Sequence, residues 1–160
     1  MNNEKTTPLG PGFGAGHTAQ YITIAESLRQ AFVTVHSRNA WQETFQTLSE
    51  HGLGPVCFHY FTAGAAAAET VAAKGHYFSV NRRMLNPTGR HAEVVGRMPR
   101  HRVLVESDPP FLGERTILQD LDAVYRHLAA LGQVELDQAI QQIRINFAQC
   151  RTERRRPALE

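Results

Sequence analysis

The sequence predicts an α/β protein built on a parallel sheet. Short apolar runs alternate along the chain with longer segments that have helical periodicity. The runs are apolar on both faces, which is typical of buried strands joined by right-handed helical crossovers. The chain has 160 residues, of which 42% are hydrophobic and 20% charged, so it can form one globular domain with a real core.

The N-terminal part of the chain divides into a loose segment and a helix. Residues 1–16 contain PLGPGFGAG, whose glycines and prolines cannot hold a regular element, so we expect this segment to be disordered or loosely attached. Residues 18–30 follow with a helical stripe made of Tyr21, Ile24, Ala25 and Leu28. The predicted domain therefore spans residues 17–150.

Four strands and their connecting helices follow in alternation. The apolar, β-branched or aromatic runs that predict strands are residues 31–36, 55–61, 77–80 and 102–107. Helical patterns between them cover residues 40–52, 63–75 and about 89–98. Two further helices have stripes that run from Ile117 to Leu131 and from Leu136 to Phe147. A basic tail, residues 151–160, closes the chain and is expected to be solvated.

Composition limits the cellular compartments and the kinds of partner that we expect for this protein. The formal net charge is only +2, so charge alone does not indicate a nucleic-acid-binding protein. The N-terminus has no apolar segment after Lys5, and no apolar run reaches the roughly 18 residues of a membrane span. The two cysteines form no disulfide framework, and Cys57 lies in an apolar run that predicts a buried thiol. We expect a cytoplasmic protein with no membrane partner.

Potential metal ligands end three of the four predicted strands. These residues are His36, His59 and Asp108. The carboxyl ends of parallel strands meet at one edge of the sheet, where sites form. A single strand-end histidine is more often structural, but three ligands at one level favour a metal site. Imidazole and carboxylate together suit a divalent cation such as Zn, Mn or Mg.

Other polar residues lie near the same edge. Glu106 and Asp108 are two residues apart, so they share one face of the last strand with Leu104. Asn81 ends the third strand and is expected to line the same cleft. Arg38 follows the first strand and either clamps a phosphate or carboxylate or is an ordinary surface or ion-pair charge. The remaining histidines are expected at the surface or in packing: His51, His76, His91, His101 and His127.

Several blocks resemble a known enzyme family. The blocks are VHSRNAWQETFQTL, FHYFTAG, GHYFSVNRRML and MPRHRVLVESDPPFL. In order and spacing they resemble the C-terminal half of the TatD family of metal-dependent deoxyribonucleases, and RINFAQC is similar to that family's closing helix with its Asn-Phe pair. The resemblance covers roughly Thr18 to Cys150. The HYF and YFSVN segments most resemble those of the TatD-like nucleases of Qat antiphage defence systems.

The resemblance implies a fold and a chemistry. Family members are TIM-type (β/α) barrels of the amidohydrolase kind, so this chain would be a partial barrel of about four parallel strands. They hydrolyse phosphodiester bonds in DNA from an end, with one or two divalent metals (Mg, Mn or Zn). By this resemblance His36 and His59 match two histidine ligands, and Asp108 matches the aspartate that binds metal and helps activate water. Glu106 matches the glutamate two residues before it.

The chain also departs from the family pattern. It has no His-x-His pair, and the segment expected to carry a bridging glutamate reads GPGFGAGH. Ser107 replaces a threonine, and Ala63 is inserted in the Phe-Thr-Gly turn. The ligand set is therefore incomplete unless His17 or Glu106 substitutes. We predict a TatD-like hydrolase that is truncated and inactive alone; the alternative is a degenerate, non-catalytic member that acts as a binding or assembly subunit.

Four strands are too few to close a barrel, which needs about eight. The expected half barrel exposes two sheet edges and an inner face lined with Phe and Val, and such surfaces favour association. We therefore expect a homodimer, a partner protein that completes the barrel, or marginal stability.

Overall fold

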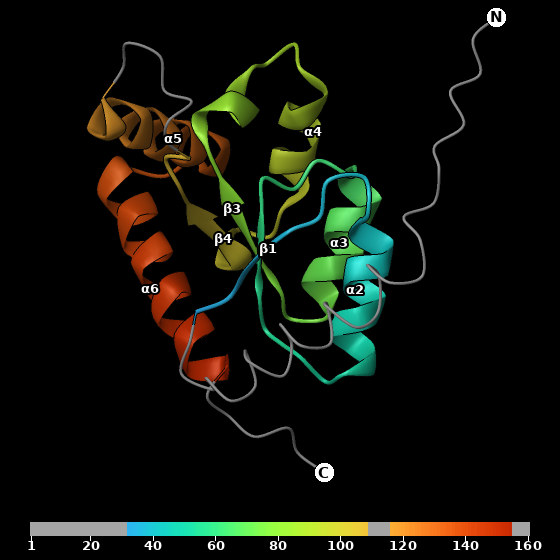
Figure 1. Ribbon diagram of the computed structural model, residues 1–160. Coiled ribbons are helices and arrows are strands. Elements are labelled where there is room, and N and C mark those ends of the chain that lie inside the picture. The colour runs from blue at the N-terminus through green and yellow to red at the C-terminus, as the bar shows by residue number, and fades with distance from the viewer. Residues whose placement is uncertain (1–31, 109–115, 155–160) are drawn as a thin grey trace, which may run out of the picture.

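Four parallel strands form one sheet whose spatial order follows the sequence (Figure 1). The structure is a computed structural model, and it describes residues 32–108 and 116–154. The strands are β1 (Thr34–His36), β2 (Cys57–His59), β3 (Tyr77–Val80) and β4 (Val103–Val105), and each pairs in parallel with the next. The predicted α/β class is confirmed. Residues 1–16 and the predicted helix at 18–30 lie outside the described residues.

Helices connect the strands and close the chain. They are α2 (Trp41–Glu50), α3 (Ala65–Ala73), α4 (Arg90–Arg97), α5 (Ile117–Gly132) and α6 (Leu136–Arg154). Two 3-10 helices, η1 (Arg82–Leu85) and η2 (Arg100–Arg102), flank α4. A capping box at Thr116 and Gln119 begins α5, while α6 continues into the basic segment as far as Arg154. In the described part of the chain, none of the helices is both long and apolar enough to cross a membrane.

The Phe and Val side chains of the sheet face the connecting helices. Phe58, Phe78 and Val103 are aligned in register across three strands and lie in the main hydrophobic core. Residues of α2, α3 and α4 pack in the same core: Leu48, Val71 and Val94. The expectation of an exposed inner face lined with Phe and Val is therefore wrong. Because side chains alternate along a strand, these residues point towards the helices and their neighbours occupy the other face.

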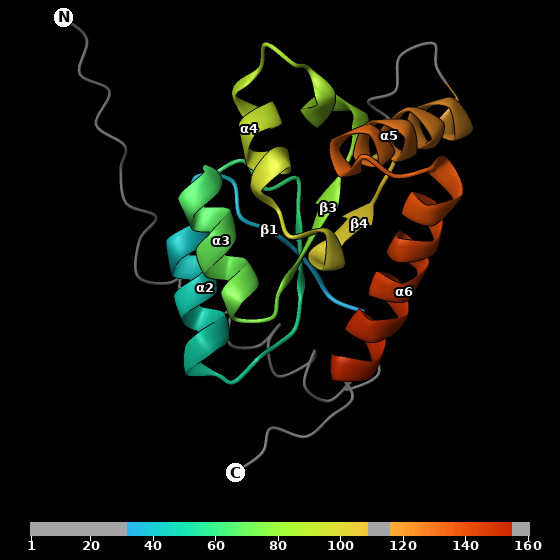
Figure 2. The ribbon, with the colours of Figure 1, turned by 180° about the vertical axis from the view of Figure 1, so that it is seen from behind.

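The opposite face of the sheet packs against the last helix. Cys57, Tyr77 and Leu104 form a second buried cluster with Cys150 of α6. Both views show α6 across the sheet from α2 and α3 (Figures 1 and 2). The sheet thus lies between two helical layers in the described residues. Cys57 is completely buried, as its apolar run predicts.

A buried asparagine joins α6 to the start of β4. Nδ2 of Asn146 donates to the carbonyl oxygens of Arg100 and Val103, both at 2.7 Å. Its Oδ1 accepts from Nε2 of Gln142 at 2.8 Å. Asn146 is fully buried, so these bonds satisfy its amide and supply donors to carbonyls at the beginning of β4. The asparagine of the RINFAQC block therefore holds the closing helix on the sheet.

Candidate functional site

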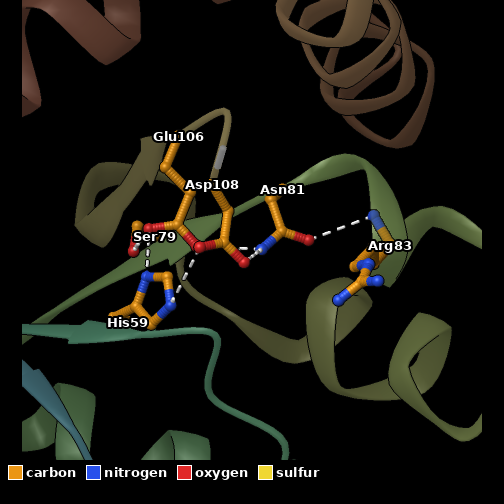
Figure 3. A network of polar contacts seen from close by, with 6 residues as sticks. All are labelled: His59, Ser79, Asn81, Arg83, Glu106 and Asp108. Carbon is orange, nitrogen blue, oxygen red and sulfur yellow. Dashed lines mark hydrogen bonds and ion pairs between the residues drawn. The ribbon is translucent and has the colours of Figure 1, made fainter. Parts of the chain in front are cut away.

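Polar side chains gather at the carboxyl ends of β2, β3 and β4 (Figure 3). His59 is the last residue of β2 and is paired in register with Ser79 of β3. Asn81 follows β3, and Glu106 and Asp108 follow β4. Parallel strands bring their carboxyl ends to one edge, which is why residues so far apart in sequence meet here. The structure thus brings together four predicted site residues and adds Ser79.

Glu106 is the centre of this network. Its Oε2 accepts hydrogen bonds from Nδ1 of His59, at 2.6 Å, and from the hydroxyl of Ser79. Its Oε1 accepts from Nδ2 of Asn81 at 3.0 Å. Side chains from β2 and from β3 and its end therefore hold the carboxylate that follows β4, and both of its oxygens are engaged. Glu106 acts here as a support for its neighbours.

The bond to Glu106 sets the chemistry of His59. A ring nitrogen that donates to a carboxylate carries a proton, so in the neutral imidazole the lone pair is on Nε2. Metal-binding histidines are commonly oriented in this way by a carboxylate behind the ring. Nε2 of His59 lies 3.7 Å from Oδ1 of Asp108, which is too long for a hydrogen bond. Two ligand atoms that bind the same tetrahedral cation, each at about 2.1 Å from it, lie about 3.4 Å from each other. The 3.7 Å between Nε2 of His59 and Oδ1 of Asp108 is close to this separation.

Asp108 adopts an unusual backbone conformation at this position. Its φ of 51° lies in the left-handed region, which few non-glycine residues occupy. Its carboxylate faces both Nε2 of His59 and Nδ2 of Asn81, the latter at 3.5 Å. The side chains of His59 and Asp108 are each 24% exposed, so an ion or water molecule can reach them. Strained residues of this kind are concentrated at functional sites.

The remaining candidates lie at the same edge but outside the network. His36 ends β1, opposite His59, and the two ring centroids are 5.4 Å apart. Arg38 is exposed in the turn after β1, and no hydrogen bond or ion pair among the described residues joins it to the network. Within the same residues, no three or more His, Cys, Asp and Glu side chains are grouped so that they could hold a metal ion. The nitrogen and oxygen ligands among the described residues therefore form only part of the coordination shell of a metal ion.

Sequence reasoning missed Ser79. Its one signal is a polar residue inside the apolar run YFSV, and only the strand register shows that it lies beside His59. Asn81 also has a structural task, because its Oδ1 accepts from the backbone N–H of Arg83 at 3.0 Å and caps η1. Burial raises the pKa of the nearby Cys57 to about 12, so its thiol stays protonated at neutral pH.

Comparison with known proteins decides the family. The family model described as TatD-related DNase matches residues 17–151. The chain belongs to the TatD family. Human deoxyribonuclease TATDN3 is 31% identical over 81 residues, which are 51% of this chain and 29% of the human protein. The resemblance predicted from the sequence blocks is confirmed.

Two solved TatD structures share the fold. A TatD-family hydrolase from Entamoeba histolytica has a TM-score of 0.70 at 14% identity and covers 87% of this chain. YJJV, a TatD homolog from Escherichia coli K12, has a TM-score of 0.66 at 20% identity and covers 81%. The match takes in 58% and 55% of those two chains. The chain therefore has the fold of part of a TatD barrel, as predicted, and spans little more than half of these structures.

Proposed function

We propose that this chain contributes to a metal-dependent hydrolase that cleaves phosphodiester bonds in DNA. The observation that carries the proposal is the His59–Glu106 pair, in which Nε2 of His59 faces the carboxylate of Asp108 at 3.7 Å. A supported imidazole beside a carboxylate is the donor pair of hydrolytic metal sites. The family and the name of the human relative support DNA as the substrate class.

The residues take distinct roles in this proposal. His59 and Asp108 hold a divalent cation (Mg, Mn or Zn), with His36 as a further ligand candidate beside His59. When bound, such a cation stabilises the charge that develops on the phosphate. Asp108 accepts the proton of the attacking water. Glu106 holds the tautomer of His59, Asn81 orients Asp108, and Arg38 binds a phosphate of the substrate.

Further ligands must come from outside the described residues. His17 of this chain or residues of a second chain are the candidates. We propose that a second copy or a partner protein completes the barrel, and that the assembly acts in the cytoplasm. Membership of the Qat subgroup stays a prediction.

The absence of a three-ligand group among the described residues supports a second candidate function, a non-catalytic binding or assembly subunit.

Hydrolysis of a labelled oligonucleotide separates the two functions. Purified protein is incubated with single- or double-stranded DNA and Mg, Mn or Zn over a wide range of protein concentration. Where the assembled protein cleaves DNA, we expect the rate to fall by about 100-fold or more in Asp108→Asn, because the group that accepts the water proton is lost. Asp122→Asn is the matched control, since this carboxylate is exposed on α5 and pairs with Arg126.

The outcome without cleavage is equally informative. If no metal supports hydrolysis at any concentration, the nuclease proposal fails for this chain alone. Calorimetric titration with Mn or Zn then shows whether the site still binds metal. Binding that His59→Ala abolishes would leave a metal-binding subunit that needs another chain for catalysis.

A further inference from the structure

A pocket of about 290 Å³ lies between α4, α5 and α6, away from the site at the strand ends. Apolar side chains form most of its wall, among them Val95, Met98, Leu128 and Ile143. It borders Val103 at the start of β4, whereas the site residues follow the end of that strand. An apolar cavity of about 150 Å³ holds benzene. This pocket has room for a bicyclic aromatic or a medium-length alkyl chain.

One cation lies in the wall of this pocket. Arg100 is the only charged residue among those described that line it. Nη2 of Arg100 donates to the carbonyl oxygen of Leu131 at 3.4 Å, a long bond that engages one of five guanidinium donors. Leu131 is 47% exposed and Val134 is 36% exposed, so the pocket wall includes apolar side chains that reach solvent. A cation beside apolar walls suits an anion that has an apolar body.

Two glycines shape the pocket in opposite ways. A Cβ added at Gly132 would lie 2.9 Å from Cζ of Arg100, so the absence of a side chain lets the guanidinium lie against the end of α5. A Cβ added at Gly96 would meet nothing within 4 Å among the described residues. Glycine inside a helix destabilises it relative to alanine, yet Gly96 lies within α4 and lines the pocket. We read Gly96 as the residue that keeps this wall open.

We propose that the pocket between α4, α5 and α6 binds a small organic anion. Its apolar body, of the size of a bicyclic aromatic or a medium alkyl chain, fills the space beside Gly96, and its carboxylate or similar group pairs with Arg100. The proposal is independent of the hydrolase proposed above, because the two sites lie at opposite ends of β4.

Two fluorescent probes with nearly the same rings test it. 8-Anilinonaphthalene-1-sulfonate is an anion, and N-phenyl-1-naphthylamine is its neutral analogue. We expect the full chain to bind one equivalent of either probe, the anion about tenfold more tightly because of the charge-assisted bond to Arg100, and decanoate to displace both. Failure of both probes to bind, or equal affinities for the two, would overturn the proposal.

Variants locate the binding. Gly96→Leu fills the pocket and is expected to weaken both probes by about tenfold or more, while the thermal midpoint stays equal or rises. Gly96→Ala tests the same wall with a smaller side chain, should the leucine not be tolerated. Arg100→Gln is expected to remove the preference for the anion and to retain neutral binding. Arg126→Gln, an exposed arginine of α5 that does not line the pocket, is the control. Anion binding that survives in Gly96→Leu would contradict the assignment.

Discussion

The two ends of the sheet both bury polar side chains, but they use them differently. At the start of β3 and β4, Arg102 donates to Glu153 at 2.6 Å and to the carbonyl oxygen of Gly75 at 3.0 Å. Its guanidinium lies 4.7 Å from the centre of the Tyr77 ring, whose hydroxyl donates to Glu153 at 3.0 Å. At the carboxyl end, Nε2 of His59 and Asp108 face each other without a hydrogen bond.

The difference follows the division of labour in parallel (β/α) folds, where one end serves stability and the other chemistry. Burial raises the pKa of Tyr77 well above its usual range, so the phenol remains a donor to Glu153. At the other end, Tyr60 and Asp108 have φ values of 48° and 51°. Left-handed non-glycine residues cost about 1–3 kcal/mol each. At the start of β3 and β4 the side chains are therefore paired with one another, and we call this the closed end. At the carboxyl end the facing atoms of His59 and Asp108 remain available to a metal ion.

The largest expected change is at the closed end. Asn146→Ala leaves the buried carbonyl of Val103 without its Asn146 donor, and leaves the carbonyl of Arg100 with only the backbone N–H of Val103, so we expect the free energy of unfolding to fall by about 2–4 kcal/mol. Urea unfolding measures this loss. Gln142→Ala removes only a bond to Asn146 and is expected to cost about 1 kcal/mol. Equal losses in the two variants would show that Asn146 does not hold α6 on the sheet.

The next largest expected effect is at the carboxyl end of the sheet, where the candidate site lies. It concerns the affinity for metal more than the stability of the fold. Glu106→Gln places an amide N–H against one of three donors, so His59 loses its fixed orientation. We expect affinity for Mn or Zn to fall by about 10–100-fold. Calorimetric titration measures it, with Ser79→Ala as the milder comparison because it removes one donor. Unchanged affinity in Glu106→Gln would separate this network from metal binding.

A smaller effect is expected from the ion pair at the closed end. Arg102→Met removes the bonds to Glu153 and Gly75 and should lower the free energy of unfolding by about 1–2 kcal/mol. The loss is moderate because Nε of Arg102 is already buried without a hydrogen-bond partner in the described residues. Metal affinity should stay the same in this variant. A metal-binding defect here would mean that the two ends are coupled.

The smallest expected effect concerns His127, which lies outside both ends of the sheet. Its contribution to the pH dependence of stability is the background against which any effect of the site histidines is measured. Burial lowers the pKa of His127 below its ordinary 6.5. The unfolded chain therefore takes up this proton before the folded chain does. The contribution to stability is complete above about pH 6.5 and is lost as the pH falls towards the folded pKa. Unfolding midpoints from pH 7.5 to 5 measure it. A steeper decline in wild type than in His127→Gln is expected, and identical curves would contradict it.

The sequence by itself determined the order of strands and helices and the placement of His59, Asn81, Glu106 and Asp108 at one edge. These features depend on local patterns: apolar runs, helical stripes and polar residues at strand ends. Only the tertiary structure decided which side chains touch. Register placed Ser79 beside His59, and packing decided which side chains donate to Glu106, for which the sequence had predicted a supporting role. The tertiary structure also turned Phe58 and Phe78 towards the helices and set Asn146 against β4. Contacts between strands depend on register and packing, which no single stretch of sequence contains.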